Sequence, residues 1–204
     1  MDEYPVRFSV DYPDRPLNRL TTAFRIFTIL PILLIVLLLE HTDFRAGNHW
    51  FELSSGGGLV VLPVVLMLLF RRKYPRWWFD WNLEFSRFTN RLTVYWLLMD
   101  DQYPSTDEHQ SVHLEFPEVS GPELNRWLPL VKWILAIPHY IVLFFLALAA
   151  FFVVIFAWFA ILFTGRYPRG AFEFVEGVMR WGNRVEGYTI ALVTDKYPPF
   201  SLAP

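Results

Sequence analysis

The chain has 204 residues, of which 54% are hydrophobic, 19% aromatic and 19% charged, and its formal net charge is −2. Soluble domains carry about 25% charged residues, so the composition favours a protein that meets a lipid bilayer, and the near-neutral charge argues against a nucleic-acid partner. Because the chain has no cysteine, a disulfide framework, an iron–sulfur cluster and a thiol nucleophile are excluded within it.

Three charge-free stretches, residues 26–39, 53–70 and 133–165, predict membrane helices. One crossing needs about 20 apolar residues, and backbone groups in lipid must pair internally, which favours helices. The last stretch suits either a tight hairpin that turns near Ala149 and Ala150 or one long tilted helix. We predict an all-α membrane protein with about four transmembrane helices in two hairpins. The alternative for the second hairpin is a shallow entry into one leaflet.

The basic residues predict the orientation. If residues 40–52 form an outer loop, every Lys and Arg except Arg45 falls on one side of the membrane. Basic residues stay cytoplasmic during insertion, so we expect a multi-pass protein with both termini and residues 71–132 in the cytoplasm. The N-terminus has no basic region before its first apolar run, which argues against a cleaved signal peptide.

The chain also repeats itself, which predicts a tandem duplication. Matched positions are 107 residues apart near the start of each copy and 93 apart later, as in the pairs 17–19 with 124–126, 74–76 with 167–169, and 90–91 with 183–184. We therefore predict a first repeat at residues 1–104 and a second at 105–204. Each has a short strand, a transmembrane hairpin and an amphipathic helix. The drop in offset places extra residues of copy one between Pro31 and Phe70.

Two patterns define the elements outside the apolar stretches. Apolar residues alternate with polar ones at residues 6–12 and 112–116, which predicts short half-buried strands. Apolar residues step by three and four after Pro75 and again after Pro168, which predicts two amphipathic helices. These helices could lie in the cytoplasmic headgroup region or pack together as a small core, and the period does not separate the two arrangements.

Several motifs resemble a bacterial integral-membrane family known as domain of unknown function 4389. They are Tyr-Pro-Val-Arg-Phe near the start, Pro-Leu-Asn-Arg-Leu, Phe-Thr-Gly-Arg-Tyr-Pro-Arg-Gly at residues 163–170, and Asp-Lys-Tyr-Pro-Pro-Phe near the end. The resemblance extends from Tyr4 to Leu202. It implies a bacterial inner-membrane location and carries no assigned activity, so it transfers no catalytic residues.

Six basic residues are candidates for contact with anionic lipid headgroups or a partner, because juxtamembrane Arg and Lys often bind phosphate groups: Arg19, Arg25, Arg91, Arg126, Lys132 and Arg184. The competing interpretations are snorkelling of Arg25 and Lys132 to the interface, and capping or anchoring by the Asn-Arg pairs.

Four further residues are predicted to pack at helix interfaces: Trp78, Trp81, His139 and Trp181. An ionisable group within a membrane segment is a functional candidate, so His139 could ligate a haem or pigment, but polar side chains also commonly join helices. In the outer loop, His41, Asp43, His49 and Glu52 lack metal-ligand spacing. We predict no metal and no cofactor.

The sequence predicts a non-catalytic protein. It has no catalytic triad ordering, no paired carboxylates in its apolar stretches and no nucleotide-binding loop. We expect a scaffold or accessory subunit of a larger membrane complex, whose partners are membrane lipids and other membrane subunits or further copies of this chain. The alternative is a small-solute or lipid transporter or channel built from parallel repeats.

Overall fold

The computed structural model describes the whole chain except residues 1–3, 41–43, 47–48, 52–57, 107 and 120–123, and it describes no side chains between residues 35 and 63. Its helices and strands follow in the order β1 (Arg7–Val10), α1 (Arg19–Ala23), α2 (Arg25–Glu40), β2 (Phe44–Ala46), β3 (His49–Phe51), α3 (Gly58–Arg71), α4 (Arg76–Trp96), β4 (Val112–Glu115), α5 (Leu128–Leu135), α6 (Ile137–Thr164) and α7 (Arg169–Thr189).

The prediction of four transmembrane helices is wrong. Within the described residues only Leu128–Thr164 is long and apolar enough to cross a membrane. Helices α2 and α3 have 16 and 14 residues, which at 1.5 Å per residue gives roughly 24 and 21 Å, short of the ~30 Å hydrocarbon core. The chain is instead mostly helical with small two-stranded sheets.

The predicted turn near Ala149 and Ala150 is also absent, because α6 runs unbroken through both residues. Alanine is the strongest helix former, and no Gly, Asn or Asp lies nearby to support a turn. The helix ends only at Gly165, whose φ of 75° is the left-handed conformation that glycine adopts after a helix. The long helix α6, rather than a hairpin, is therefore the form that residues 137–164 take, after the short helix α5.

The two alternating stretches pair with each other as antiparallel strands. In this sheet Phe8 lies opposite Leu114, and Val10 lies opposite Val112. The apolar residues of both strands are buried, while Arg7, Ser9, His113 and Glu115 point to the other face. A second antiparallel pair, β2 with β3, occupies part of the region that was predicted as an outer loop.

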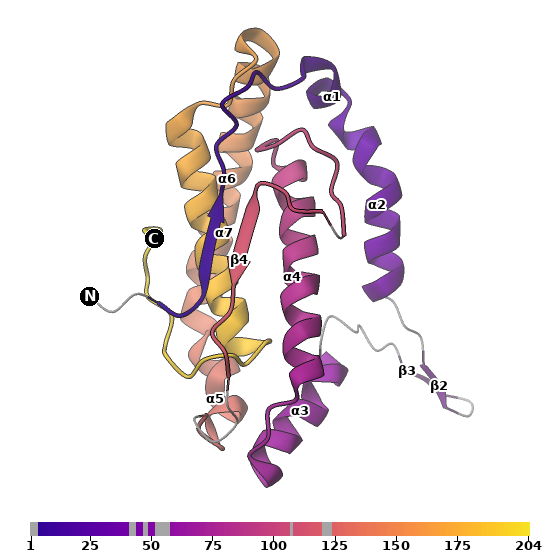
Figure 1. Cartoon of the computed structure of the whole chain (residues 1–204), viewed down its shortest axis with the longest axis vertical. Coiled ribbons are helices and arrows are strands. Elements are labelled where there is room, and N and C mark those ends of the chain that lie inside the picture. The colour runs from indigo at the N-terminus through magenta and orange to yellow at the C-terminus, as the bar shows by residue number, and fades with distance from the viewer. Residues whose placement is uncertain (1–3, 41–43, 47–48, 52–57, 107, 120–123) are drawn as a thin grey trace.

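The strands, α7 and α6 form three successive layers (Figure 1). Helix α7 buries apolar residues on both sides, and Phe172 and Val175 share one core with Phe8, Leu114 and Ile161. Helix α4 lies beside α7, and β4 packs against α4. The amphipathic stripe of α7 therefore packs in the protein core.

Candidate functional site

Helices α4 and α7 are joined by a reciprocal pair of buried amides. The side-chain amide of Asn90 donates to Oδ1 of Asn183 at 2.7 Å, and the amide of Asn183 donates to Oδ1 of Asn90 at 2.9 Å. Each amide also donates to a backbone carbonyl of its own helix: Asn90 to that of Ser86, and Asn183 to that of Met179. All four amide N–H groups are thereby satisfied, and this polar contact fixes how the two helices sit against each other.

Two cations at matched sequence positions, Arg25 and Lys132, are both buried. The Arg25 guanidinium lies 3.8 Å from the centroid of the Tyr95 ring, and the Lys132 ammonium lies 4.8 Å from that of Tyr188. Lys132 also forms an ion pair with Asp195 at 2.8 Å and donates to the Thr194 carbonyl at 2.6 Å. The second cation is thus compensated by acceptors within the chain.

Arg25 has no comparable acceptor. Its Nε, Nη1 and Nη2 make no hydrogen bond to any residue that the structure describes, although the side chain is only 3% exposed. The residue matched to Asp195 is Asp101, but its carboxylate accepts from the Asn18 N–H and pairs with Arg15. Partial burial raises the pKa of Asp101, yet these hydrogen bonds and the charges of Arg15 and then Arg25 lower it below its ordinary value overall.

An apolar groove of about 590 Å³ lies beside Arg25. Its walls come from the end of α1, the start of α2, the end of α4, the middle of α6 and the first half of α7. Small side chains, Ala147 and Ala150 of α6, leave room in it, and larger ones such as Val154 and Val178 line it. Arg25 is the only charged residue among those that line the groove in the described part of the chain.

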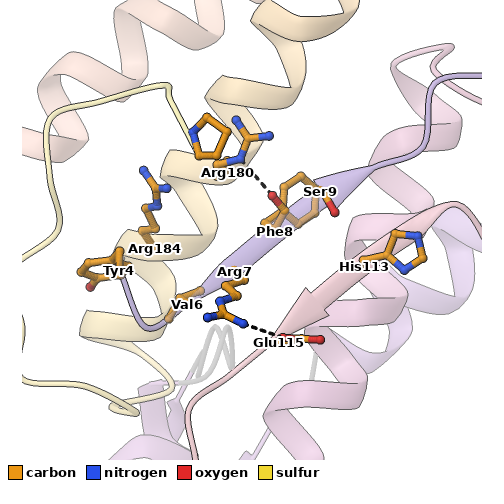
Figure 2. Close-up of a pocket in the computed structure, with 10 residues that line it drawn as sticks. Tyr4, Val6, Arg7, Phe8, Ser9, His113, Glu115, Arg180 and Arg184 are labelled. Carbon is orange, nitrogen blue, oxygen red and sulfur yellow. Dashed lines mark hydrogen bonds and ion pairs between the residues drawn. The ribbon is translucent and has the colours of Figure 1, made fainter. Parts of the chain in front are cut away.

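A second cleft, of about 380 Å³, lies between β1, α7 and the C-terminal segment. Figure 2 shows Arg180 and Arg184 projecting from α7 beside β1. Arg180 donates to the carbonyls of Phe8 and Leu202 and pairs with Glu176. Arg180 therefore joins the strand, the helix and the C-terminal segment, which leaves it little capacity to bind a phosphate group.

Arg184 lies in the same cleft, with its guanidinium carbon 5.7 Å from the centroid of the Tyr4 ring. It donates to the Ser201 carbonyl at 3.3 Å, while its Nε has no hydrogen-bond partner among the described residues. Burial, and then the charge of Arg180, lower the pKa of Arg184. Arg184 faces the strand layer, on the side of α7 away from the groove beside Arg25.

His139 lies in an aromatic cluster. Its Nδ1 accepts from the indole N–H of Trp181 at 3.0 Å, and its ring stacks on Phe200 with centroids 4.0 Å apart. The ring of Tyr197 is 4.8 Å away, and the His139 side chain is fully buried. This geometry ties the start of α6 to α7 and to the C-terminal segment.

Residues 127–201 match the family model "Domain of unknown function (DUF4389)". Over these residues the match confirms the resemblance predicted from the sequence. No curated protein and no solved structure shows significant similarity to the chain. The DUF4389 match covers α5, α6 and α7 with the His139 cluster, and the rest of the groove, including Arg25, comes from residues before it.

The other predicted contact residues lie apart from one another. Arg19 is exposed and donates to the Phe163 carbonyl at the end of α6, where a helix favours positive charge. Arg91 is buried and donates to the Ser105 carbonyl. Arg126 is half-buried, just before the DUF4389 match. The six basic candidates therefore do not gather at one site.

The two remaining tryptophans differ sharply in exposure. Trp78 is buried and donates its indole N–H to the Ala191 carbonyl, whereas Trp81 is 53% exposed and stacks on Phe85. These placements bear on packing only, and the roles proposed for the site residues stay predictions.

No group of three or more metal-ligating side chains gathers in the part of the chain that the structure describes. The candidates His41, Asp43 and Glu52 lie outside the described residues, as does the side chain of His49.

Neither the groove nor the pairing of Arg15 with Asp101 was predicted from the sequence. Arg15 occupies the carboxylate that would otherwise pair with Arg25. A signal was present in the repeat itself, because the position matched to Arg15 at the offset of 107 is Pro122. The second half therefore has no rival cation for Asp195 at that position.

Proposed function

We propose that this chain is a non-catalytic protein of the bacterial inner membrane that embeds one apolar flank in the cytoplasmic leaflet and serves as a scaffold or accessory subunit of a membrane complex. The observation that carries the proposal is the exposure of α6. The most apolar window of Leu128–Thr164 is only 11% buried, whereas the core helix of a soluble protein is mostly covered. The exposed phenylalanines of α6 are Phe144, Phe145, Phe151, Phe152, Phe156, Phe159 and Phe163.

The neighbours of α6 favour a position along the membrane surface rather than across it. Residues 175–179 of α7 line the same groove as residues 147–154 of α6, so the two helices lie side by side at mid-length. At that level α7 carries the Glu176–Arg180 pair, and the strand layer beyond it carries the exposed pair Arg7 and Glu115. If α6 crossed the bilayer, these charged side chains would lie in its hydrocarbon core, where charged groups have a high free-energy cost.

The basic clusters also support this orientation. Arg71, Arg72 and Lys73 are exposed at the end of α3, and Arg166 and Arg169 are exposed after α6. Figure 1 places the α3 end and the α6 end at opposite ends of the molecule. Basic residues favour the cytoplasmic side of a membrane, so both clusters should lie on that side. They do so if α6 lies flat in the cytoplasmic leaflet, because both of its ends are then at the same headgroup level. Both termini then stay in the cytoplasm.

We also propose that residues 1–104 and 105–204 are repeats. Contacts at matched positions support this. Arg87 donates to the Leu114 carbonyl, as Arg180 does to that of Phe8. The Asn18 N–H donates to Asp101, as the Asn125 N–H does to Asp195.

Single cysteines test the membrane placement cleanly, because the chain has none of its own. We expect a bimane label at Phe152→Cys to be quenched by lipids that carry nitroxide groups in their acyl chains, while a label at Ser9→Cys is not. We also expect Lys73→Cys and Arg166→Cys to react with an impermeant maleimide in inverted vesicles only. Reaction of the two positions from opposite sides would show that α6 crosses the bilayer.

The scaffold role is tested by purification in mild detergent from native membranes. A defined membrane partner in fixed ratio supports it. A self-oligomer alone, together with solute flux after reconstitution into liposomes, would favour the transporter alternative.

A further inference from the structure

We infer that the groove beside Arg25 binds one anionic phospholipid, with an acyl chain in the groove and the phosphate group on the Arg25 guanidinium. This inference rests on the proposed placement of the chain in the cytoplasmic leaflet.

Arg25 is a buried cation without a hydrogen-bond partner among the described residues. A guanidinium presents five N–H donors, and in this protein none of its nitrogens meets an acceptor among the described residues, at 3% exposure. The Tyr95 ring covers one face of the guanidinium at 3.8 Å. A ring face attracts the charge but accepts none of the in-plane hydrogen bonds. A buried cation without acceptors is costly, so an anion that reaches this position is strongly favoured.

The second step is that the nearby carboxylates are occupied. Asp101 pairs with Arg15, and Asp100 accepts from Arg15 and from the Ser111 hydroxyl. At the matched position in the second half, Lys132 has both Asp195 and a carbonyl. The chain thus gives Lys132 a direct carboxylate partner, whereas Asp100 and Asp101 act on Arg25 through their charges alone and leave its N–H groups for an external anion.

The third step is the shape and surroundings of the groove. Its volume of about 590 Å³ falls in the ordinary range of ligand pockets, roughly 300–1,000 Å³. It lies between the exposed apolar residues of α2, such as Ile26 and Leu30, and those of α6. An acyl chain enters such a groove directly from the lipid that surrounds these residues.

The fourth step is the headgroup. Arginine binds phosphate oxygens bidentately, and anionic phospholipids are present on the cytoplasmic side of membranes. A membrane-embedded groove with one arginine among apolar walls therefore fits a phospholipid such as phosphatidylglycerol. A free fatty acid, whose headgroup is a carboxylate, is the other source of an anionic acyl chain, and the test below separates the two.

The test reconstitutes the full chain in nanodiscs that contain phosphatidylcholine and phosphatidylglycerol in equal amounts. Native mass spectrometry after release counts the lipids retained. We expect about one phosphatidylglycerol per chain, and Arg25→Gln to lower its retention by at least about tenfold, because charge-assisted hydrogen bonds contribute about one tenfold step or more. Arg76→Gln is the matched control, since Arg76 is exposed on α4, where it pairs with Asp80 and lies over the Phe79 ring. This variant should retain as much phosphatidylglycerol as the wild type.

A second variant, Ala150→Trp, fills the groove without altering charge and should also abolish retention, which keeps the test decisive if Arg25→Gln folds poorly. Equal phosphatidylglycerol retention in wild type and both variants, with membrane association intact, overturns this inference and leaves the proposed membrane placement standing. Failure of the wild type to associate with lipid at all overturns the proposed placement itself. Extraction of a fatty acid in place of phospholipid from protein purified from native membranes also overturns the assignment.

Discussion

The reciprocal amide pair between α4 and α7 allows a quantitative test of how the two helices are held together. Asn90 and Asn183 are both buried and exchange two hydrogen bonds of 2.7 and 2.9 Å. Asn90→Ala removes both bonds. It leaves the side-chain oxygen Oδ1 of Asn183, and one N–H group of its side-chain amide, without partners. Because the pair is reciprocal, Asn183→Ala has the mirror effect on Asn90.

The expected magnitude follows from these groups. A buried polar group without its partner costs about 1–3 kcal/mol, and a lost hydrogen bond about 1 kcal/mol. Each single variant should therefore lose about 2–4 kcal/mol of unfolding free energy. The double alanine variant removes both amides and leaves no orphaned partner, so it should cost about as much as one single variant. The coupling energy of the cycle is then about 2–4 kcal/mol in magnitude, equal to the loss of one single variant.

The assay is equilibrium unfolding by sodium dodecyl sulfate in mixed micelles, monitored by circular dichroism. Thr89→Ala is the control, because its hydroxyl bonds only to carbonyls of its own helix; it should couple to Asn183→Ala by less than about 0.5 kcal/mol. Additive losses for Asn90→Ala and Asn183→Ala would refute the reasoning, since they would mean that the two amides do not depend on each other.

Three further predictions use the same assay. Gly187→Ala should destabilise by about 1–3 kcal/mol, because the added Cβ would lie 2.8 Å from Cγ2 of Val6, whereas Gly182→Ala, which meets nothing within 4 Å, should be neutral or stabilise by up to about 1 kcal/mol; equal effects would contradict this. Burial raises the pKa of Glu186, so its ionisation opposes folding above the ordinary glutamate pKa of about 4.3, and Glu186→Gln should stabilise at pH 7 with a gain that vanishes below about pH 4. Asp101 has a lowered pKa, so its ionised form contributes stability above about pH 4 that is lost on acidification; Asp101→Asn should destabilise at pH 7, and a constant difference down to pH 2 would rule out the ion pair as the cause.

Local periodicity predicted the elements whose pattern is set by one buried face. The alternation at residues 6–12 and 112–116 appears as β1 and β4, and the spacing after Pro75 and Pro168 appears as α4 and α7. A two-residue or 3.6-residue period reports directly on which side chains face a core. The uniform apolar stretch at 133–165 has no such period to report, and its length alone was compatible with both a hairpin and a single helix.

The basic candidates show the same limit. Arg25 and Lys132 are equivalent in sequence, yet only one has a carboxylate partner, because Arg15 occupies Asp101. That competition depends on side chains that meet from three separate segments, which no spacing along the chain encodes. The groove is equally non-local, since its walls come from five helices.

Because α6 is continuous, the extra residues between Pro31 and Phe70 of the first half are not a longer hairpin loop. Matched positions are 107 apart at Pro31 and 93 apart at Phe70, so the insertion lies where the second half has the interior of one helix. The proposed repeat unit is therefore a strand, a long helix and an amphipathic helix, and copy one carries its long helix as α2 and α3. Figure 1 shows α2 and α6 running in opposite directions. A two-fold axis that exchanges Asn90 with Asn183 relates two antiparallel helices. If both helices lie parallel to the membrane surface, that axis is perpendicular to the surface. In the proposed placement, the basic ends of both copies then reach the headgroups of a single leaflet.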